Sequence, residues 1–375
     1  MIGGVENTPK LRFPEFSGEW SSTTLGEISD CLDKKRIPLK EGDRSQRRGV
    51  YPYYGASGVI DHIDDYLFDE PLVLLAEDGA NILLRSTPVA FIADGKFWVN
   101  NHAHVYRAHG STRFLAEILE KIDYTKFNTG TAQPKLNGEV CKKLPLAVPK
   151  LPEQQKIAVF LGAVDLRIGQ LTRKKALLED YKKGCMQQLF TQKLRFNDDQ
   201  GNDFPDWEEK KLGEVASYKA GQFVQASMIS DKQAPQLFPC YGANGLRGYT
   251  ESKTHSGHHT LIGRQGALCG NVQLVSGDFH ATEHAIVVSP NDSANVVWLF
   301  YELGRLKLNR FATGQAQPGV SVDTIVQLKT AFPHPDEQQK IADFLSAIDA
   351  KISLVSDQLT QAQAFKKGLL QHMFV

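Results

Sequence analysis

Few residues of this chain have the types and spacing that an active site requires. The segment PDWEEK (205–210) contains the letters of a PD…ExK nuclease signature, but its acids are packed into one short segment, whereas that signature normally spreads them over separate strands. Histidines could bind a metal, yet the sequence contains no second pair of metal ligands at the spacing that a helix or a zinc knuckle requires. We expect structural or exposed roles, and no metal, for His102, His104, His255, His258 and His259.

Motifs that bind nucleotides or cofactors are also missing from the sequence. It contains no GxxxxGK[ST] phosphate loop, no glycine-rich FxGxG segment of the kind found in adenosylmethionine sites, and no [ND]PP[YF] segment that would hold a flipped adenine. The sequence therefore predicts a chain that is not an enzyme and has no cofactor of its own.

The composition is that of an ordinary globular protein. The 375 residues predict two or three domains, and 41% apolar residues suffice for packed cores. No segment resembles a signal peptide or a membrane span of about 20 apolar residues, so we expect a cytoplasmic protein. The five cysteines include no CxxC pair, which favours free thiols. Lys and Arg together number 43, as do Asp and Glu, so any affinity for nucleic acid must come from local patches.

An internal repeat is the strongest feature of the sequence. TTLGEIS around Leu25 matches KKLGEVA around Leu212, which is 187 positions later (212 − 25). YPYYGASG from Tyr51 matches FPCYGANG from Phe238 at the same separation. The chain therefore consists of two related halves.

The halves match again near their ends, where the separation is 184 positions (312 − 128). There NTGTAQPKL from Asn128 matches ATGQAQPGV from Ala312, and PEQQKIAVFLGAVDLRI matches DEQQKIADFLSAIDAKI. In between, at 60–127 and 247–310, the halves barely match. Two similar scaffolds that recognise different ligands would diverge in this way, and so would an old duplication that drifts, and the sequence leaves both explanations open.

Each EQQKIA segment begins a long run with helical spacing of apolar residues. Pro152 and Pro335, each beside acidic residues, suit helix starts, because proline is tolerated in the first turn and acids favour the positive end of the helix dipole. A helix of about 38 residues is roughly 57 Å long, and such a rod needs a partner to bury its apolar stripe. The stripe residues are Ile157, Leu161, Val164, Ile168, Leu171 and Leu178 in the first run and Ile341, Leu345, Ile348, Ile352, Val355 and Leu359 in the second.

We expect these helices to pair with each other as an antiparallel coiled coil; packing of each helix on its own domain or on another protein is the alternative. Strand-like runs such as LVLLAED (from Leu72) and helical segments such as RFLAEILEKI (from Arg113) predict mixed globular parts. The predicted fold is α+β, with two similar mixed α/β domains separated by the long helices and related by a pseudo-two-fold repeat. The predicted boundaries are 1–150 and 193–334 for the domains, 151–192 for the central helix and 335–375 for the C-terminal helix.

Two divergent globular regions, each followed by a TGxAQP turn and then by a long EQQKIA helix, resemble the specificity subunit of type I restriction-modification systems over essentially the whole chain. The resemblance implies two target-recognition domains, each reading one half of a bipartite, asymmetric sequence in double-stranded DNA. It also implies that the helices set the unread spacer and dock methyltransferase (modification) subunits, with restriction/translocase subunits joining the complex. Adenosylmethionine, ATP and Mg²⁺ would then belong to those partners, and no membrane would be involved.

Basic residues interleaved with tyrosines follow the first LGEIS segment, and such a combination suits contact with phosphates. Most charge runs, however, are only solvated surface. The second half has different polar residues at matching places. The residues that we predict to contact DNA are Lys34, Lys35, Arg36, Arg47, Arg48 and Tyr54 in the first half and Lys219, Gln222, Tyr241, Asn244, Arg247, Arg264 and Gln265 in the second.

One exchange between the halves bears on sequence recognition. Arg264 and Gln265 precede a Gly-Ala pair that both halves share, where the first half has Glu77 and Asp78. Arginine and glutamine pair bidentately with guanine and adenine, and a carboxylate accepts from cytosine. Different half-sites would need such an exchange, and drift at exposed positions would also produce it. The TGTAQP and TGQAQP turns occur in both halves, so a structural role or phosphate contact suits them better than specificity.

Two other functions fit the same features. One is a non-DNA helical adaptor whose globular ends bind proteins, which the zero net charge favours slightly. The other is a fragment of an enzyme that reaches DNA only through a catalytic half on another chain. Binding of the purified chain, with a methyltransferase partner, to random and selected duplexes separates the three.

Overall fold

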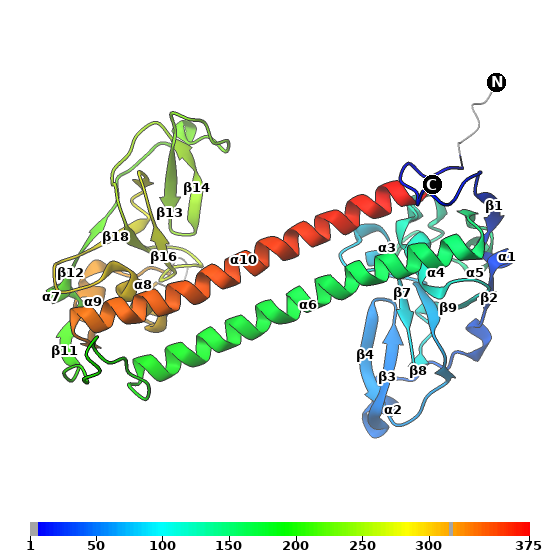
Figure 1. Cartoon of the computed structure of the whole chain (residues 1–375), viewed down its shortest axis with the longest axis horizontal. Helices are drawn as coiled ribbons and strands as arrows, with labels where there is room; N and C mark the ends of the chain where they lie inside the picture. Colours follow the sequence, from blue (N-terminus) through cyan, green and yellow to red (C-terminus); the bar gives the residue numbers. More distant parts are fainter. Residues whose placement is uncertain (1–6, 315–317) are drawn as a thin grey trace. The chain divides into compact units, whose positions relative to one another are not determined.

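A computed structural model describes residues 7–314 and 318–375 of the chain. By its internal contacts the chain divides into unit 1, Met1–Lys174 with Val355–Val375, and unit 2, Lys175–Leu354. Each unit contains one globular domain and a part of each long helix (Figure 1). Within the described residues, no helix combines the length and the apolar character that a membrane span needs.

The domain of unit 1 is built on a four-stranded sheet of order β2-β9-β6-β7 and a second sheet of order β4-β3-β8-β5, with a two-stranded β1-β10 sheet beside the first long helix. Its strands are β1 (Ser21–Thr24), β2 (Ser29–Cys31), β3 (Arg48–Gly55), β4 (Gly58–Ile63), β5 (Phe68–Asp69), β6 (Leu72–Ala76), β7 (Ala90–Ala93), β8 (Lys96–Val99), β9 (Ala103–Ala108) and β10 (Pro145–Val148). Its short helices are α1 (Leu25–Ile28), η1 (Asp33–Lys35), α2 (Glu41–Gln46), α3 (Asn81–Leu84), α4 (Thr112–Lys121), η2 (Tyr124–Phe127) and α5 (Gly138–Lys142).

The domain of unit 2 repeats this plan with sheets of order β12-β18-β15-β16, β14-β13-β17 and β11-β19. Its strands are β11 (Glu208–Lys211), β12 (Ala216–Ala220), β13 (Phe238–Gly242), β14 (Gly245–Thr250), β15 (His259–Gly263), β16 (Val272–Val275), β17 (His280–Ala281), β18 (Ala285–Pro290) and β19 (Lys329–Phe332). Its short helices are α7 (Leu212–Val215), η3 (Ala226–Met228), α8 (Val296–Arg305), η4 (Leu308–Phe311) and α9 (Val322–Val326).

Even irregularities of the sheets recur. The β3-β4 hairpin shifts register between Tyr53 and Tyr54, and the β13-β14 hairpin shifts between Cys240 and Tyr241, the matching positions. In both domains the first strand of the hairpin also pairs in parallel with a later strand, β8 or β17. A bulge strengthens the local twist and turns a hairpin away from its sheet, and each hairpin extends from its own domain (Figure 1). The predicted repeat of two similar α/β domains is thus confirmed.

The long helices are α6 (Leu151–Phe190, 40 residues) and α10 (Pro335–Met373, 39 residues). In unit 1, Lys366 Nζ of α10 lies 2.8 Å from Asp165 Oδ1 of α6. In unit 2, Lys182 Nζ of α6 lies 2.6 Å from Asp349 Oδ1 of α10. In each unit an early segment of one helix therefore meets a late segment of the other, which confirms the predicted antiparallel pairing.

All the predicted stripe residues are buried or half-buried, as a seam requires. The ends of the helices, however, enter the cores of the domains. Ile157 and Leu161 pack in the core of unit 1 together with Leu369 from the end of α10. Ile341 and Leu345 pack in the core of unit 2 together with Leu189 from the end of α6. The first turns of each long helix therefore also pack on the helix's own domain, which was the alternative to pairing.

The first glutamate of each EQQKIA segment fastens the helix to its domain. Its carboxylate is buried, with an exposed side-chain fraction of 3% for Glu153 and 0% for Glu337. An arginine and a tryptophan from the peptide before the first strand donate to it in both units. The contacts are Arg12 Nε to Glu153 Oε1 (2.7 Å) and Trp20 Nε1 to Glu153 Oε1 (3.3 Å), and Arg195 Nη2 to Glu337 Oε2 (2.8 Å) and Trp207 Nε1 to Glu337 Oε2 (3.0 Å).

The next residue, Gln154 or Gln338, joins the same long helix to a shorter helix of its domain. Gln154 Oε1 accepts from the backbone N–H of Ser111, the N-cap of α4, and Gln338 Oε1 accepts from Asn295, the N-cap of α8. The amide nitrogen of each glutamine donates to the carbonyl of the proline before the helix, at 2.9 Å in both units. The motif therefore repeats because it fixes the angle at which each long helix leaves its domain.

Candidate nucleic-acid interface

A cleft of about 480 Å³ opens in unit 2 between the tip of the β13-β14 hairpin and the turn after β15. Residues 242–247 of the hairpin, Gln265 and Gly266 of the turn, and His284 before β18 line it. Three residues predicted to contact DNA, Asn244, Arg247 and Gln265, thus come together there. They meet because the hairpin tip approaches the end of β15, where the backbone of Ala243 lies close to Gly263.

The same backbone arrangement of hairpin tip and turn occurs in unit 1, with different side chains. By the repeat, residues 55–60, 77–79 and 102 correspond to residues 242–247, 264–266 and 284. We call each of these sets the hairpin edge of its domain. At the positions of Asn244, Arg247 and Gln265, the hairpin edge of unit 1 carries Ser57, Ile60 and Asp78. One backbone design therefore presents two different sets of hydrogen-bonding groups.

Glycines and the TGxAQP turns hold this frame. Gly79 and Gly266 have φ of +109° and +88°, a backbone conformation that suits glycine. Their N–H groups donate to Pro134 O (3.0 Å) and Pro318 O (2.9 Å), the last residues of the two turns. The turns thus support the hairpin edge through backbone contacts, while Gln315–Gln317 of the second turn lie outside the described residues.

A histidine lies on each hairpin edge and contacts the residue before the shared glycine. His102 Nδ1 is 2.9 Å from both carboxylate oxygens of Asp78, and His284 Nδ1 is 3.1 Å from Gln265 Oε1. Sequence reasoning missed His284 and assigned His102 no role in recognition. The signal was the His-Ala dipeptide at matching places, 102–103 and 284–285, which the weak similarity around it hid.

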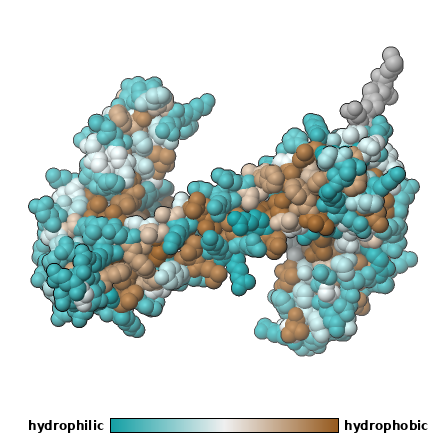
Figure 2. Space-filling model, viewed as in Figure 1, coloured by the Kyte–Doolittle hydropathy of each residue, from teal (hydrophilic) through white to brown (hydrophobic). Residues whose placement is uncertain are grey.

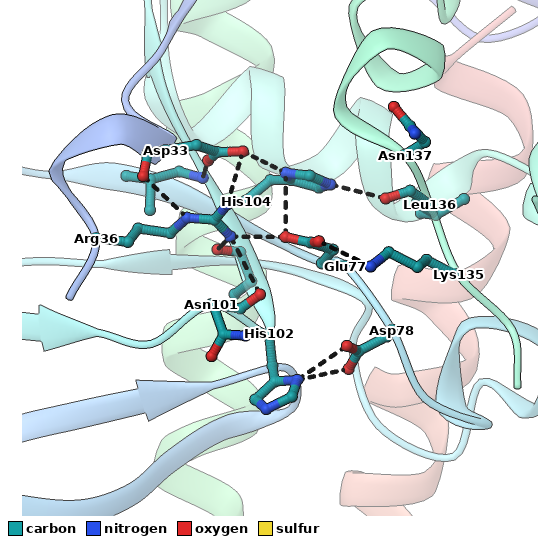
Figure 3. A network of polar contacts seen from close by, with 12 residues as sticks. Asp33, Arg36, Glu77, Asp78, Asn101, His102, His104, Lys135, Leu136 and Asn137 are labelled. Carbon is teal, nitrogen blue, oxygen red and sulfur yellow. Dashed lines mark hydrogen bonds and ion pairs between the residues drawn. The ribbon is translucent and has the colours of Figure 1, made fainter. Parts of the chain in front are cut away.

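The residue next to Asp78, Glu77, belongs to a buried network instead (Figure 3). Arg36 Nη1 donates to Glu77 Oε2 at 2.8 Å, and Arg36 Nη2 lies 3.1 Å from Asp33 Oδ2. His104 Nδ1 contacts Asp33 Oδ2 at 2.5 Å, and its Nε2 contacts the carbonyl oxygen of Leu136 at 2.9 Å. The network ties η1, the end of β6 and the start of β9 together beneath the hairpin edge.

The described residues of unit 2 do not repeat this network, because the matching positions are Ala220, Phe223, Arg264 and Ile286. The predicted exchange of Glu77 for Arg264 is therefore part of a change in the framework of the domain. Arg36, with 13% of its side chain exposed, and Glu77, with 15%, are engaged with each other. The structure thus gives Arg36 a structural role, which leaves its guanidinium unavailable for a phosphate.

Asp33, Glu77 and His104 are close enough to suggest a metal site, but their electrostatics argue against one. Burial by itself would lower the pKa of His104, yet the Asp33 carboxylate beside it raises that pKa to about 10. The two ring nitrogens of His104 also lie 2.5 Å from Asp33 Oδ2 and 2.9 Å from the carbonyl oxygen of Leu136, so each faces an acceptor within the domain. Arg36 and Lys135 also supply positive charge to Glu77, Lys135 Nζ at 3.4 Å. The cluster is an ion-pair network, in agreement with the structural role expected for His104.

This network predicts a pH-dependent stability of unit 1. A pKa raised from 6.5 to about 10 in the folded state stabilises the fold below pH 6.5, and that contribution is lost as the pH rises toward 10. We expect the variant His104→Gln to be less stable than the natural chain at pH 6.5, with a difference that shrinks as the pH approaches 10. Urea unfolding at several pH values measures this difference; a difference that stays constant would contradict the charged state of His104.

The other predicted contact residues differ in how far the fold engages them, and Arg264 is half-buried. Arg47 donates to Asp64 Oδ1 at 3.0 Å and covers the Trp98 ring, and Tyr54 and Tyr241 pack edge-on against phenylalanines of their domains. These side chains are partly committed to the fold. The predicted contact residues with exposed side chains are Lys34, Lys35, Arg48, Lys219, Gln222, Asn244 and Arg247.

Comparison with known proteins agrees with this duplicated frame. The family described as "Type I restriction modification DNA specificity domain" matches the chain twice, over residues 17–180 and 205–364. The chain belongs to this family. The two matches cover the two domains with most of the helix that follows each, so one specificity domain corresponds to one half of the repeat. The family description names DNA specificity, the role that the sequence predicted for the chain.

Individual relatives are described as specificity subunits. Over 149 residues the chain is 44% identical to the specificity subunit of the type I restriction enzyme EcoprrI of Escherichia coli, an alignment that covers 40% of this chain and 37% of that subunit. It is 22% identical to the MjaVIII specificity subunit of Methanocaldococcus jannaschii, over 96% of this chain and 92% of that subunit. A crystal structure of the type I restriction-modification S subunit from M. genitalium has the same fold, with a TM-score of 0.75 and 18% identity over 98% of this chain and 99% of that one.

Proposed function

We propose that this chain is the DNA-specificity subunit of a type I restriction-modification complex, in which each specificity domain reads one half of a bipartite, asymmetric target. The hairpin edge carries the proposal, because the same backbone frame occurs twice with different polar side chains. A frame fixed by backbone contacts places a side chain in the same way each time, and exchanging that side chain changes the base that it selects.

Exposed basic residues in both units suit the unspecific part of binding. Lys34, Lys35 and Arg48 in unit 1 and Lys219 in unit 2 are exposed, and in our proposal they contact phosphates. Such contacts supply affinity and register without sequence information. They also explain how a chain with no net charge can bind DNA.

In this proposal the paired helices set the spacer and dock the methyltransferase subunits. A helix of about 40 residues is about 60 Å long, which exceeds one DNA turn of about 34 to 36 Å. Hydrophobic side chains also reach the surface along α6 and α10 (Figure 2), which suits a protein partner. They include Val159, Leu166, Leu177, Leu354 and Phe365.

The partner subunits would supply the chemistry of the complex. Adenosylmethionine, ATP and Mg²⁺ would be bound by the methyltransferase and restriction/translocase subunits, and the complex would work in the cytoplasm.

The test is a gel-shift series with the purified chain and its methyltransferase partner, first on random duplexes and then on selected ones. We expect selected duplexes to bind at least about 1,000-fold more tightly than random ones. Scrambling either half-site should abolish this preference, and scrambling the spacer should not. Binding that is indifferent to sequence, or an absence of DNA binding by a well-assembled complex, would favour the adaptor function instead.

A further inference from the structure

We infer that residues 78 and 265 are the matching base-reading positions of the two specificity domains, and that His102 and His284 are positioning residues that orient them. Asp78 would select a base that presents an exocyclic amino group, cytosine or adenine, and Gln265 would select adenine. The inference rests on the proposed function and assigns part of its specificity to particular atoms.

In unit 1 the geometry sets Asp78 apart from its neighbour. Glu77 is bound by Arg36 and Lys135 and is therefore engaged within the domain. Asp78 instead contacts only His102 through its side chain among the described residues, and half of the His102 side chain is exposed (50%). Each carboxylate oxygen has room for more than one hydrogen bond. Asp78 can therefore accept a further hydrogen bond from a ligand at the surface while His102 holds it.

In unit 2 the same arrangement occurs with an amide. His284 stands between Gln265 Oε1 (3.1 Å from its Nδ1) and Glu283 Oε1 (3.2 Å from its Nε2). If the ring donates to Gln265 Oε1, the NH₂ group of that amide is left to donate outward. Behind the cleft, Glu283 Oε2 and the buried hydroxyl of Thr282 have no hydrogen-bond partner among the described residues.

The two side chains differ in what they can recognise. An ionised carboxylate only accepts hydrogen bonds, so Asp78 pairs with the amino group of cytosine or adenine and is repelled by the acceptor atoms of guanine and thymine. Glutamine both donates and accepts, which matches N7 and the amino group of adenine. A histidine that is hydrogen-bonded to the Asp78 carboxylate or the Gln265 amide fixes the orientation of that group. The orientation decides which atoms on the edge of a base the side chain can reach.

Reciprocal exchange tests the reading positions. The complex of full-length chain and methyltransferase subunits is used to enrich binding sequences from a random duplex library, with the chain as it is and with Asp78→Gln or Gln265→Asp. We expect Asp78→Gln to favour adenine and exclude cytosine at one position of one half-site, and Gln265→Asp to admit cytosine where adenine alone was preferred, with binding to the excluded base weakened about 10-fold to 100-fold. Asp30→Gln is the matched control, because Asp30 also pairs with a histidine, His109 at 3.0 Å, at the opposite end of β9.

Substitution of His102 distinguishes a role in positioning Asp78 from a role in folding. His102→Ala should make the preference at the same base pair degenerate, and His102→Asn, which keeps a donor near the place of Nδ1, should restore it. A loss of stability alone would weaken binding to all sequences equally and leave the preference unchanged.

The outcomes distinguish the inference from the function on which it rests. An enriched bipartite sequence that Asp78→Gln and Gln265→Asp leave unchanged would overturn the inference while the proposed function stands. No enriched sequence with the natural chain would overturn both. A change in base preference with Asp30→Gln would also overturn the inference, because the effect would then not be specific to the hairpin edge.

Discussion

Inserting one heptad into each long helix is expected to abolish binding to the original DNA target and to select a spacer about 3 base pairs longer. Seven residues add about 10.5 Å of helix, and one base pair occupies about 3.4 Å. A shift of about 3 base pairs also turns the second half-site by nearly a third of a helical turn of about 10 base pairs, so the original target no longer fits both domains.

The structure shows where the heptads belong. Insertion between Leu171 and Leu178 of α6, and between Ile352 and Leu359 of α10, keeps the apolar stripe in phase because a heptad is close to two helical turns. Both sites lie between the Asp165–Lys366 and Lys182–Asp349 ion pairs, so each pair keeps its partners. Enrichment from libraries with random spacer length measures the effect.

A heptad in one helix alone is the control for this prediction. It breaks the register between the two helices, and we expect it to lower stability without defining a new spacer. Altered half-sites with an unchanged spacer would count against the paired helices as the ruler of the target.

The second large effect is expected at the start of the long helices. Arg12→Ala leaves the Glu153 carboxylate buried without its cation, and Arg195→Ala does the same to Glu337. Removing one member of a buried ion pair costs about 3 to 5 kcal/mol, because the remaining charge stays desolvated. We expect a loss of this size in the free energy of unfolding of unit 1 for Arg12→Ala and of unit 2 for Arg195→Ala, as measured by urea denaturation.

A matched control lies on the same helix. Lys156 pairs with Glu15, and the two side chains are 46% and 44% exposed. Exposed ion pairs contribute about 0 to 1 kcal/mol, so Lys156→Ala should change stability little. Equal losses for Arg12→Ala and Lys156→Ala would show that the buried glutamate does not anchor the helix.

Several features of this protein follow from the sequence by itself. The repeat, the two long helices and their apolar stripes are local patterns, and local patterns survive in any environment that buries them. The separations of 187 and 184 positions predicted two related domains, and the sheet orders agree. The resemblance carried by the EQQKIA and TGxAQP segments pointed to the family to which the chain belongs.

Which polar residue of the hairpin edge is neutralised within the domain was decided by tertiary structure alone. Glu77 and Asp78 are adjacent acids of the same chemistry, yet Glu77 meets Arg36, 41 positions away, and Asp78 meets His102, 24 positions away. These side chains meet their partners because the fold brings η1, the turn after β6 and the start of β9 together. A charge that is neutralised within the domain and a charge held at its surface look alike in the sequence, because the difference lies in long-range pairing and burial.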